Sequence, residues 1–364
     1  MEGLVMNAFD NIYADKRVLV TGHNGFKGTW LTEWLVELGA KVSGIALPPN
    51  TKPNHWELRT PHIDEHIQDV REEARIAAII QETQPEIVFH LAAQPLVRKS
   101  YREPLLTFST NVMGTANVLD ACRQTPSVKA IVVITTDKCY ENQEWVWGYR
   151  ENDRLGGHDP YSASKATAEL VVGCWRKSFF STNDTPLLAS ARAGNVIGGG
   201  DWAEDRLIPD LVRAVKLGEP LVIRSPRATR PWQHVLEPLA GYLMLGQKLL
   251  EGRREFAEAW NFGPDDASNQ TVETVLNHIQ SIWPVMTWQL DANPQMHEAN
   301  LLHLDSSKAR RLLHWTPVWD LEDCLEATVG WYRDHLSGKP VPTKFQIEAY
   351  CETARQQGAE WIRP

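Results

Sequence analysis

Two short segments of the chain carry side chains that can move protons and support hydride transfer. Thr136, Asp137 and Lys138 follow an apolar run, which places an acid and an amine side by side at the end of an expected strand. Tyr161 and Lys165 open a helical pattern further along the chain. Residues four positions apart face the same side of a helix, so the phenol and the ammonium are expected one turn apart. Together the two segments predict a hydride-transfer site with additional acid–base groups.

The tyrosine–lysine pair has a defined chemical use. A fixed ammonium favours the phenolate, so Lys165 is expected to lower the pKa of Tyr161 from about 10 towards the working pH. Tyr161 can then take a proton from a substrate hydroxyl while hydride leaves the same carbon. Asp159 is expected to cap this helix and Pro160 to occupy its first position. The plain alternative is a chance pair on a surface helix.

A glycine-rich turn precedes these segments and indicates where a cofactor would bind. Gly22, Gly25 and Gly28 follow the first expected strand directly and open the first expected helix. Glycines at this point allow a tight turn and a close approach of the backbone to a pyrophosphate, whose charge the helix N-terminus stabilises. The GxxGxxG spacing is typical of short-chain dehydrogenase/reductases. The predicted cofactor-binding residues of this turn are Gly22, His23, Asn24, Gly25, Phe26, Lys27 and Gly28.

Further cofactor signals come from the ends of other strands. Leu91, Ala92 and Ala93 end the fourth expected strand, where small residues leave space for the nicotinamide half of a dinucleotide; the alternative is a well-packed strand end. Asp69, followed by Val70, is a candidate acceptor for the adenine amino group, and a turn aspartate explains it equally well. The second expected strand ends without the acidic residue that usually binds the ribose of NAD, and no arginine there supports NADP. The predicted cofactor is NAD.

The elements that must position these residues alternate in type along the first half of the chain. Short β-rich apolar runs are separated by helical patterns, which predicts right-handed βαβ units and a parallel sheet covered on both faces. The predicted fold class is therefore α/β, with a doubly wound sheet of the Rossmann type. Strands are expected at residues 16–21, 41–46, 66–70, 86–91, 129–136 and 258–263, and the third of them is weak.

The second half of the chain predicts a smaller lobe. After about residue 195 the pattern loosens into stretches rich in Gly, Pro and Trp, with short helices. We expect these stretches to form a mostly helical C-terminal lobe that binds the substrate. An NAD-binding domain is predicted at 1–195, with 233–264 returning to it, and the substrate lobe at 196–232 and 265–364.

The charge and composition of the chain argue against several classes of partner. A net charge of -9 and a pI near 5.8 disfavour nucleic acid and anionic membrane surfaces. No segment resembles a signal peptide and no apolar run approaches the roughly 20 residues that span a bilayer, so we expect a cytoplasmic protein. The five cysteines are widely spaced without a CxxC pair, so neither a disulfide framework nor a metal site is predicted.

Several strings together resemble the nucleotide-sugar 4,6-dehydratases, which are extended short-chain dehydrogenase/reductases. The resemblance covers about residues 15–330 and is most specific at Thr136, Asp137 and Lys138, because the dTDP-glucose enzymes carry Glu in place of this lysine. In this respect the chain is similar to the branch of the family that uses CDP-glucose, and nothing else in the sequence indicates cytidine. The strings that carry the likeness are 21–28, 90–98, 110–115, 136–138, 159–165, 194–201 and 230–234.

The resemblance implies a redox-neutral reaction in which NAD is regenerated and water leaves the sugar. Tyr161 would take the proton of the glucose 4-hydroxyl while C4 is oxidised, and Thr136 would hydrogen-bond the 4-oxygen. Asp137 would protonate the 6-hydroxyl as it leaves. Lys138 would act at C5, either as the base or as an ammonium that stabilises the enolate, and both roles stay open. Lys165 completes the set of predicted catalytic residues.

Cations and backbone donors are expected to hold the substrate diphosphate. Asn195 and the glycines at 198–200 form an expected flexible turn whose amides can meet a phosphate. Arg206 or Arg230 can supply charge, although a surface salt bridge is the alternative for each. Asn111 is a candidate cofactor-site residue that supports a lysine, and its alternatives are packing or a bound water. The substrate-binding residues implied by the resemblance are Gln94, Arg98, Asn195, Arg206, Leu207, Arg230 and His234.

Besides a dehydratase that uses another nucleotide, two rival functions remain open at this point. A sugar-nucleotide 4-epimerase would share the glycine turn, Thr136, Tyr161 and Lys165, but it would have no use for Asp137 and Lys138. An NAD-sensing binding module on the same fold would need no catalytic tyrosine. The acid–base groups therefore favour the dehydratase over both.

The family resemblance also implies an assembly and a biological setting. Helices at 111–122 and 161–172 would form a four-helix contact between the subunits of a homodimer, although their apolar faces can equally be covered within one chain. The implied setting is deoxysugar biosynthesis for surface polysaccharide, such as the O-antigen of lipopolysaccharide.

Overall fold

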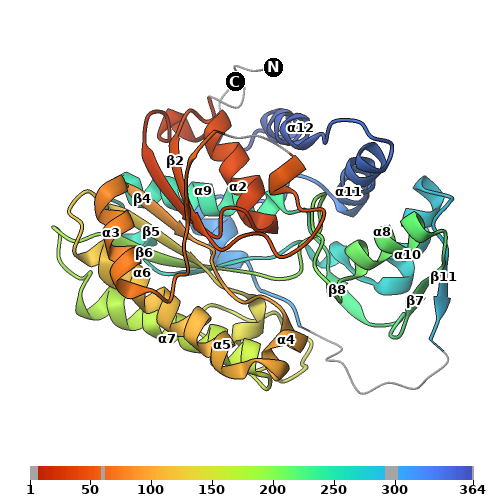
Figure 1. Cartoon of the computed structure of the whole chain (residues 1–364), viewed down its shortest axis with the longest axis horizontal. Helices are drawn as coiled ribbons and strands as arrows, with labels where there is room; N and C mark the ends of the chain where they lie inside the picture. Colours follow the sequence, from red (N-terminus) through yellow and green to blue (C-terminus); the bar gives the residue numbers. More distant parts are fainter. Residues whose placement is uncertain (1–6, 59–61, 292–301, 363–364) are drawn as a thin grey trace.

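A seven-stranded parallel sheet forms the centre of the computed structural model, which describes residues 7–58, 62–291 and 302–362 (Figure 1). The strand order is β3-β2-β1-β4-β5-β6-β9, and every neighbouring pair is parallel. This arrangement confirms the predicted α/β class. The strands are β1 (Arg17–Thr21), β2 (Lys41–Ala46), β3 (Asp64–Ile67), β4 (Ile87–His90), β5 (Ala130–Ile134), β6 (Leu187–Ala193) and β9 (Ala259–Phe262).

Helices cover both faces of the sheet, so most of its strands contribute side chains to two hydrophobic cores. Successive residues of a strand point to opposite faces. On β1, Val18 and Val20 pack with α2 and α9, whereas Leu19 packs with α3, α6 and α7 on the other face. The βαβ connections of a doubly wound sheet produce this two-sided burial. The covering helices are α2 (Phe26–Glu37), α9 (Leu236–Leu250), α3 (Glu73–Thr83), α6 (Gly114–Arg123) and α7 (Pro160–Ser178).

Five of the six predicted strands lie in this sheet where the sequence places them, within one or two residues at each end. The third, expected at 66–70, instead spans Asp64–Ile67, because only these four residues pair with β2. The sequence does not predict β6. Its residues, Leu-Leu-Ala-Ser-Ala-Arg-Ala, lack the β-branched and aromatic side chains that mark a strand, yet all seven are buried between β5 and β9.

A smaller lobe lies beyond one end of the sheet, on the right in Figure 1. β8 (Thr229–Pro231) pairs antiparallel with β10 (Asn269–Thr271), and β7 (Leu221–Ile223) pairs parallel with β11 (Trp288–Leu290). The helices α8 (Leu207–Leu217) and α10 (Val272–Ile282) lie with these strands. The lobe therefore contains two small sheets in addition to the predicted helices.

The C-terminal helices α11 (Leu321–Leu336) and α12 (Thr343–Gln356) follow the lobe in sequence, and α12 packs on the sheet domain. Tyr350 on α12 meets Trp34 of α2 edge-on, with ring centroids 5.7 Å apart. Trp361 stacks on Phe9 at a centroid distance of 4.9 Å. The last segment of the chain is thus held against the sheet domain by aromatic contacts.

The remaining elements are short. α4 (Val97–Arg102), α5 (Pro104–Phe108) and a π-helical turn, Ser109–Met113, lead into α6. Within the described ranges, no helix has both the length and the apolar character needed to cross a bilayer. The other single turns of 3-10 or π helix are Phe9–Asn11, Trp56–Leu58, Asp137–Cys139, Arg254–Phe256, Asp266–Ser268 and Ala309–Leu313.

Candidate active site

The turn after β5 carries three of the predicted catalytic residues at the carboxyl edge of the sheet. Thr136 caps the 3-10 turn Asp137–Cys139, because its Oγ1 accepts a hydrogen bond from the Lys138 N–H at 3.3 Å. Thr136 Oγ1 also donates to Asp137 Oδ1 at 2.9 Å. Thr136 and Asp137 are buried, and Lys138 is half-buried. Open α/β sheets bind their ligands at this edge, so the turn lies where substrate chemistry is expected.

Helix α7 brings Tyr161 and Lys165 to the same edge. The helix begins at Pro160 and is capped by the side chain of Asp159, as the sequence predicts. Lys165 Nζ donates to the Ile134 carbonyl at 3.2 Å, which ties the helix to the last residue of β5. Tyr161 and Lys165 are both buried. The helix and the turn after β5 therefore form one site.

Burial controls the protonation of two of these groups. It raises the pKa of Asp137, an effect that the ammonium of Lys138 opposes. Burial also lowers the pKa of Lys165 to about 8, although the carboxylate of Glu169 favours the ammonium. Asp137 can therefore remain a neutral acid at a higher pH than an ordinary aspartate, whereas Lys165 keeps its full charge only below about 8.

The pKa of Tyr161 differs from the sequence-based expectation. Burial raises the pKa of Tyr161 to about 12, and a hydrogen bond with Thr136 offsets this only in part. Lys165 directs its ammonium at the Ile134 carbonyl, so its charge does not overcome the cost of burying a phenolate. The prediction that Lys165 lowers this pKa towards the working pH is therefore wrong for the protein alone.

Lys27 adds a cation that the sequence assigns only to the cofactor turn. Its Nζ donates to Tyr242 Oη at 3.4 Å. Burial lowers the pKa of Lys27 to about 7, with the positive charges of Arg206 and Lys165 adding to the effect and Asp137 opposing it. The ammonium of Lys27 thus lies near the catalytic residues.

We expect the substitution Lys27→Met to stabilise the ligand-free protein most at low pH. A lysine whose pKa is lowered by folding destabilises the folded state fully below its folded value of about 7, and the penalty fades as the pH rises towards the ordinary lysine value. The Tm of the variant should exceed that of the wild type by several degrees at about pH 6 and approach it at about pH 10. Scanning fluorimetry across this range would measure the difference.

Lys129→Met is a matched control, because Lys129 is exposed on the surface. Its substitution should change the Tm by less than about one degree at every pH. A gain for Lys27→Met that is independent of pH would contradict the buried-charge explanation.

The glycine turn between β1 and α2 has the shape of a phosphate cradle. Gly22 has a φ of 74°, and a Cβ at this residue would lie 2.8 Å from the backbone nitrogen of Ala92. A Cβ on Gly28 would lie 1.9 Å from the Gly22 carbonyl oxygen. Gly25 precedes α2 without a side-chain cap, so no N-cap side chain competes with an anion for the N–H groups of the first helical turn. These donors fit the pyrophosphate of a dinucleotide.

His23 and Asn24 of the turn are held by local contacts. His23 is fully buried, and its Nε2 hydrogen-bonds with Glu65 Oε2 of β3 at 2.6 Å. Burial lowers the pKa of His23, although the carboxylate of Glu65 opposes this. Asn24 Nδ2 donates to the Leu47 carbonyl at 2.8 Å, and Phe26 is the first residue of α2. The turn is thereby attached to both β2 and β3.

The ends of β1 and β4 are joined beside the glycine turn. Thr21 Oγ1 hydrogen-bonds with His90 Nδ1 at 2.7 Å and accepts a bond from the Ala92 N–H at 3.2 Å. His90 Nε2 hydrogen-bonds with Thr115 Oγ1 at 3.0 Å. Residues 91–93, predicted to contact the cofactor, are partly exposed directly after this junction. Their position next to Gly22 is compatible with that role.

Asp69 lies in a turn after β3 rather than at the end of the strand. Its carboxylate accepts three hydrogen bonds from the Arg71 side chain, at 2.6 to 3.1 Å, and these bonds lower the pKa of Asp69. This is the geometry of the turn aspartate that the sequence left as an alternative. Val70 is buried, and a Cβ on Gly114 would lie 2.7 Å from its Cγ2. The adenine contact stays a prediction.

Asn111 lies in the π-helical turn and connects two parts of the site. Its Oδ1 accepts from the Gln94 N–H at 2.8 Å, and its Nδ2 donates to the Gln94 carbonyl at 3.1 Å. Nδ2 also donates to Ser164 Oγ at 2.8 Å. Asn111 therefore holds the neighbour of Lys165 on α7, and its hydrogen bonds do not run to the lysine directly. Such π-helical turns are frequent at functional sites.

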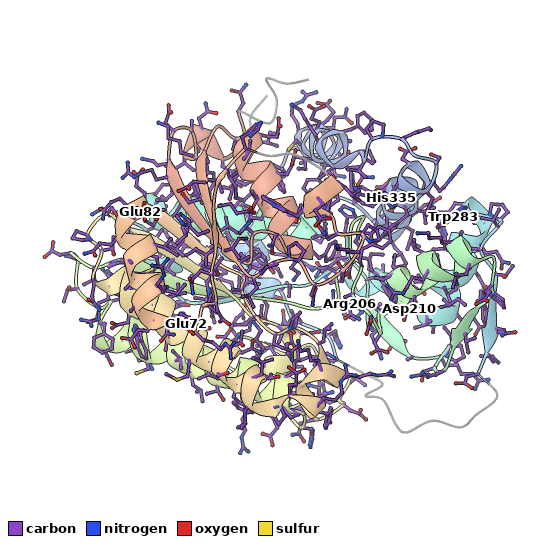
Figure 2. All side chains as sticks on the ribbon, viewed as in Figure 1. Glu72, Glu82, Arg206, Asp210, Trp283 and His335 are labelled. Atoms are coloured by element: carbon purple, nitrogen blue, oxygen red, sulfur yellow. The ribbon has the colours of Figure 1, made fainter. Side chains whose placement is uncertain are left out.

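Arg206 stands where the second lobe approaches the sheet domain (Figure 2). Its Nη1 lies 2.9 Å from Asp201 Oδ2, and this carboxylate raises the pKa of Arg206. The charge of Arg206 lowers the pKa values of both Lys27 and Tyr161, so the guanidinium is close to both. Leu207 follows it as the first residue of α8. Among the predicted substrate residues, Arg206 thus has a charge that acts on the predicted catalytic groups.

The other predicted substrate residues surround this point less closely. Arg98 Nη1 lies 2.6 Å from Asp205 Oδ1, which links α4 to the segment before α8. Arg230 is on β8, and Asn195 is exposed just after β6. Gln94 is buried, and its side-chain amide donates within its own segment and to α5. These residues belong to the sheet domain and to the second lobe, and their contacts with a substrate stay a prediction.

Tight packing surrounds two parts of the predicted substrate site. His234 is fully buried, with its ring edge-on to Trp30 and Trp319 at centroid distances of 5.6 and 4.9 Å, and its contact with a substrate stays a prediction. The glycine-rich turn after β6, which the sequence predicts to be flexible, is closely packed. A Cβ on Gly199 would lie 1.9 Å from Trp331 Cγ, and Trp30 Nε1 donates to the Gly199 carbonyl at 2.9 Å. The glycines are there because aromatic side chains pack against the backbone.

The fold and the site together define a class of protein. A glycine turn after β1, a tyrosine–lysine helix and a threonine after β5 are the parts of a short-chain dehydrogenase/reductase site, and the Asp–Lys pair adds a second set of acid–base groups. Within the described part of the chain, no group of three or more His, Cys, Asp or Glu could hold a metal ion.

Comparisons with known proteins agree with this class. The family model described as GDP-mannose 4,6 dehydratase matches residues 19–328. A CDP-glucose 4,6-dehydratase of Salmonella typhimurium is 49% identical over 349 residues, which cover 93% of this chain and 97% of that protein. The solved epimerase Mth375 of Methanothermobacter thermautotrophicus has a TM-score of 0.80 at 24% identity, covering 90% of this chain and 96% of that one. A UDP-glucose-4-epimerase of Stenotrophomonas maltophila, solved with bound NAD, has a TM-score of 0.77 at 21% identity, covering 89% and 99%.

The two solved structures show a common fold, whereas the family model and the Salmonella protein show descent. The family model matches most of the chain, and the Salmonella protein matches it almost from end to end. The chain therefore belongs to the GDP-mannose 4,6-dehydratase family of short-chain dehydrogenase/reductases.

Proposed function

We propose that this protein catalyses the 4,6-dehydration of CDP-D-glucose to CDP-4-keto-6-deoxy-D-glucose and water, which makes it a hydro-lyase. The observation that carries the proposal is the position of Asp137 and Lys138 beside Tyr161 and Lys165. Tyr161 serves C4 of the sugar, and the Asp–Lys pair serves C6 and C5. The choice of CDP follows from the 49% identity to an enzyme of that substrate.

NAD is the cofactor that the glycine turn fits. The N–H groups at the start of α2 would hold its pyrophosphate, and residues 91–93 would border its nicotinamide half. When bound, NAD would supply the hydride acceptor for C4 and the hydride donor for C6. The protein itself supplies the proton transfers.

Tyr161 takes the proton of the 4-hydroxyl in the first step. Because burial raises the pKa of Tyr161 to about 12, the phenol needs cationic neighbours to act as a base near neutral pH. Arg206 already lowers this pKa, and Lys165 lies one helical turn away. Thr136 hydrogen-bonds with the phenol and can share the proton with the 4-oxygen of the sugar.

Asp137 and Lys138 carry out the elimination. Burial raises the pKa of Asp137, so a neutral carboxyl group is available to protonate the 6-hydroxyl as it leaves. Lys138 is half-buried next to it and acts on C5, as the base or as an ammonium that stabilises the enolate. Adjacent side chains of one turn thus act on the two groups that are lost: Asp137 on the 6-hydroxyl and Lys138 on the C5 proton.

The sugar nucleotide would lie between the sheet domain and the smaller lobe that contains α8, α10, β7, β8, β10 and β11. Arg206 and Arg230 would meet the diphosphate, because guanidinium groups bind phosphate oxygens in pairs. Gln94, Arg98, Asn195 and Leu207 would border the sugar and nucleotide. The product is an activated deoxysugar, and we place the reaction in the cytoplasm, in the biosynthesis of surface polysaccharide such as O-antigen.

The test is to incubate the purified protein and NAD with CDP-, dTDP-, UDP- and GDP-glucose separately. A 4-keto-6-deoxy sugar absorbs in alkali, and we expect this signal from CDP-glucose alone, without net reduction of NAD. A signal from another nucleotide sugar instead would change the proposed substrate but leave the proposed 4,6-dehydration unchanged. Formation of an epimer, or of net reduced NAD, would remove the dehydratase proposal.

Exposed apolar side chains on α5, on α7 and just before α6 support a homodimer. Leu105 on α5, Met113 before α6 and Leu170 on α7 are 84%, 55% and 61% exposed. The elements that carry them contact one another, and exposed apolar side chains on neighbouring elements favour an interaction site. We place the two-fold contact on α6 and α7, so that two helices from each subunit form a four-helix interface.

We expect Leu170→Asp to convert the dimer into a monomer. A two-fold interface repeats the substitution on both sides, so two buried charges would face one apolar contact at a cost of several kcal/mol. Sedimentation velocity at micromolar concentration would report the change. Val285→Asp is the control, because Val285 is 69% exposed in the second lobe and should leave the dimer intact. A wild-type monomer, or a Leu170→Asp dimer, would contradict this interface.

A further inference from the structure

A buried ion pair lies directly behind the catalytic turn. Glu169 Oε2 is 2.7 Å from Arg192 Nη2, and the two side chains are 3% and 4% exposed. Glu169 is on α7, one turn after Lys165, and Arg192 is on β6, next to β5. Ion pairs this deeply buried add little stability, because the loss of hydration of both charges offsets their attraction. Stability alone therefore does not explain this pair.

The carboxylate of the pair holds the residue from which the turn begins. Thr135 Oγ1 donates to Glu169 Oε1 at 2.5 Å, and Ser190 Oγ donates to Glu169 Oε2 at 2.8 Å. The Thr135 N–H donates to the Ala191 carbonyl of β6 at 2.9 Å. Thr135 immediately precedes the catalytic threonine, so Glu169 sets the exit of the chain from β5.

The guanidinium of the pair holds the residue at which the turn ends. Arg192 Nη1 donates to Tyr140 Oη at 2.7 Å and to the Glu151 carbonyl at 3.0 Å. Tyr140 Oη donates in turn to Asn261 Oδ1 of β9 at 2.8 Å. Tyr140 directly follows the 3-10 turn Asp137–Cys139. One ion pair thus contacts both flanks of the catalytic segment.

The same ion pair is attached to the other half of the active site. Tyr161, Lys165 and Glu169 recur every four residues on α7 and share one face of the helix. The charge of Glu169 favours the ammonium of Lys165 against the effect of burial. Movement of the turn relative to the tyrosine–lysine face would therefore break contacts at Glu169 or Arg192.

We propose that Glu169 and Arg192 are positioning residues that hold the catalytic turn of residues 136–138 against the tyrosine–lysine face of α7. The use of this alignment rests on the proposed function, because a 4,6-dehydration needs a base at C4 and acid–base groups at C5 and C6 of one bound sugar. Misplacement by about 1 Å can cost a reaction about a hundredfold. The ion pair fixes the distance between the turn of residues 136–138 and the tyrosine–lysine face of α7.

Two mild substitutions test the proposal without leaving a buried charge unpaired. Thr135→Val removes the contact of the turn with Glu169, and Tyr140→Phe removes the contact with Arg192. Each should lower kcat by about tenfold or more, with the KM for CDP-glucose and the affinity for NAD within about twofold of wild type. Crystal structures of both variants should show residues 136–138 displaced while α7 and β6 stay in place.

The matched control is Thr125→Val at the end of α6. Thr125 is equally buried and donates to the Ala121 carbonyl at 2.9 Å, away from the site. This variant should keep the wild-type kcat and an unmoved turn. A wild-type kcat with an unmoved turn in both Thr135→Val and Tyr140→Phe would overturn the proposal.

Two substitutions of Glu169 distinguish the effect of its charge from the effect of its side-chain length. Glu169→Asp keeps the charge but shortens the side chain, so kcat should fall with an unchanged pH profile. Glu169→Gln also removes the charge that favours the Lys165 ammonium, so the pH at which kcat stops rising should be lower than in the wild type. If the wild type does not dehydrate CDP-glucose, the proposed function fails, and the crystal structures of Thr135→Val and Tyr140→Phe still decide this inference.

Discussion

Replacement of Tyr161 by phenylalanine is expected to lower the turnover of CDP-glucose by about 10²- to 10⁴-fold, the range for loss of a general base. Phenylalanine fills the same buried volume, so the fold and the affinity for NAD should be retained. What is lost is the acceptor for the proton of the 4-hydroxyl, without which C4 is not oxidised. The measurement is kcat at saturating CDP-glucose, followed by the alkaline absorbance of the product.

The pH dependence of the same variant sharpens this prediction. Since burial raises the pKa of Tyr161 to about 12, its phenolate fraction increases with pH throughout the working range. Lys165, whose pKa burial lowers to about 8, loses its charge above that value. The wild-type kcat should therefore rise with pH up to about 8 and then level off, and the residual turnover of Tyr161→Phe should lack this rise.

Tyr101→Phe is the matched control for this experiment. Tyr101 is 66% exposed on α4, so loss of its hydroxyl should leave kcat within about twofold of wild type. If Tyr161→Phe retained more than about a tenth of wild-type turnover, another group would have to be the C4 base.

The sheet, and the approach of the turn after β5 to the start of α7, could be predicted because their signals are local. Apolar runs separated by helical patterns specify a parallel sheet, and the carboxyl ends of its strands meet at one edge. Residues that follow β5 and residues that open α7 must therefore lie close together. The contact of Lys165 with the carbonyl of Ile134 at the end of β5 is the consequence.

The features that the sequence could not predict depend on burial and on long-range packing. β6 carries an arginine and several alanines, and only its neighbours β5 and β9 make it a strand. His234 belongs to a motif that resembles a substrate site, yet Trp30 and Trp319 enclose it. In the sequence, nothing distinguishes Glu169 from other polar residues of a helix, because its partner Arg192 is brought to it only by the fold. The pKa of Tyr161 also depends on burial, which raises it, and on Thr136 and Arg206, which lower it and lie far from Tyr161 in the sequence.

Replacement of Asp137 by asparagine is expected to stop the reaction after its first half. The amide has the shape of the carboxyl group but no proton to give to the leaving 6-hydroxyl, so formation of the 4-keto-6-deoxy sugar should fall by about 10²- to 10⁴-fold. Oxidation at C4 depends on Tyr161 and should continue. Mixing of the variant with NAD and CDP-glucose should therefore produce the absorbance of reduced nicotinamide, which persists instead of returning to the baseline.

Stability provides the internal check on this variant. Burial raises the pKa of Asp137, which means that its ionised form disfavours folding at neutral pH and that the penalty fades as the pH falls towards the unfolded value. The neutral amide avoids this penalty, so the Tm of Asp137→Asn at neutral pH should equal or exceed that of the wild type. A loss of turnover can then be assigned to chemistry rather than to unfolding.

The outcome of Asp137→Asn also separates the dehydratase from its nearest rival. A 4-epimerase built on the same fold needs the tyrosine and the threonine but no acid at C6, so the substitution would leave its turnover nearly intact. Asp184→Asn, in an exposed loop before β6, should be silent for either enzyme and controls for the change of charge. Persistent reduced nicotinamide in Asp137→Asn, with none in Asp184→Asn, would place Asp137 after the oxidation of C4, because reduced cofactor accumulates when hydride has left C4 and has not yet been returned to C6.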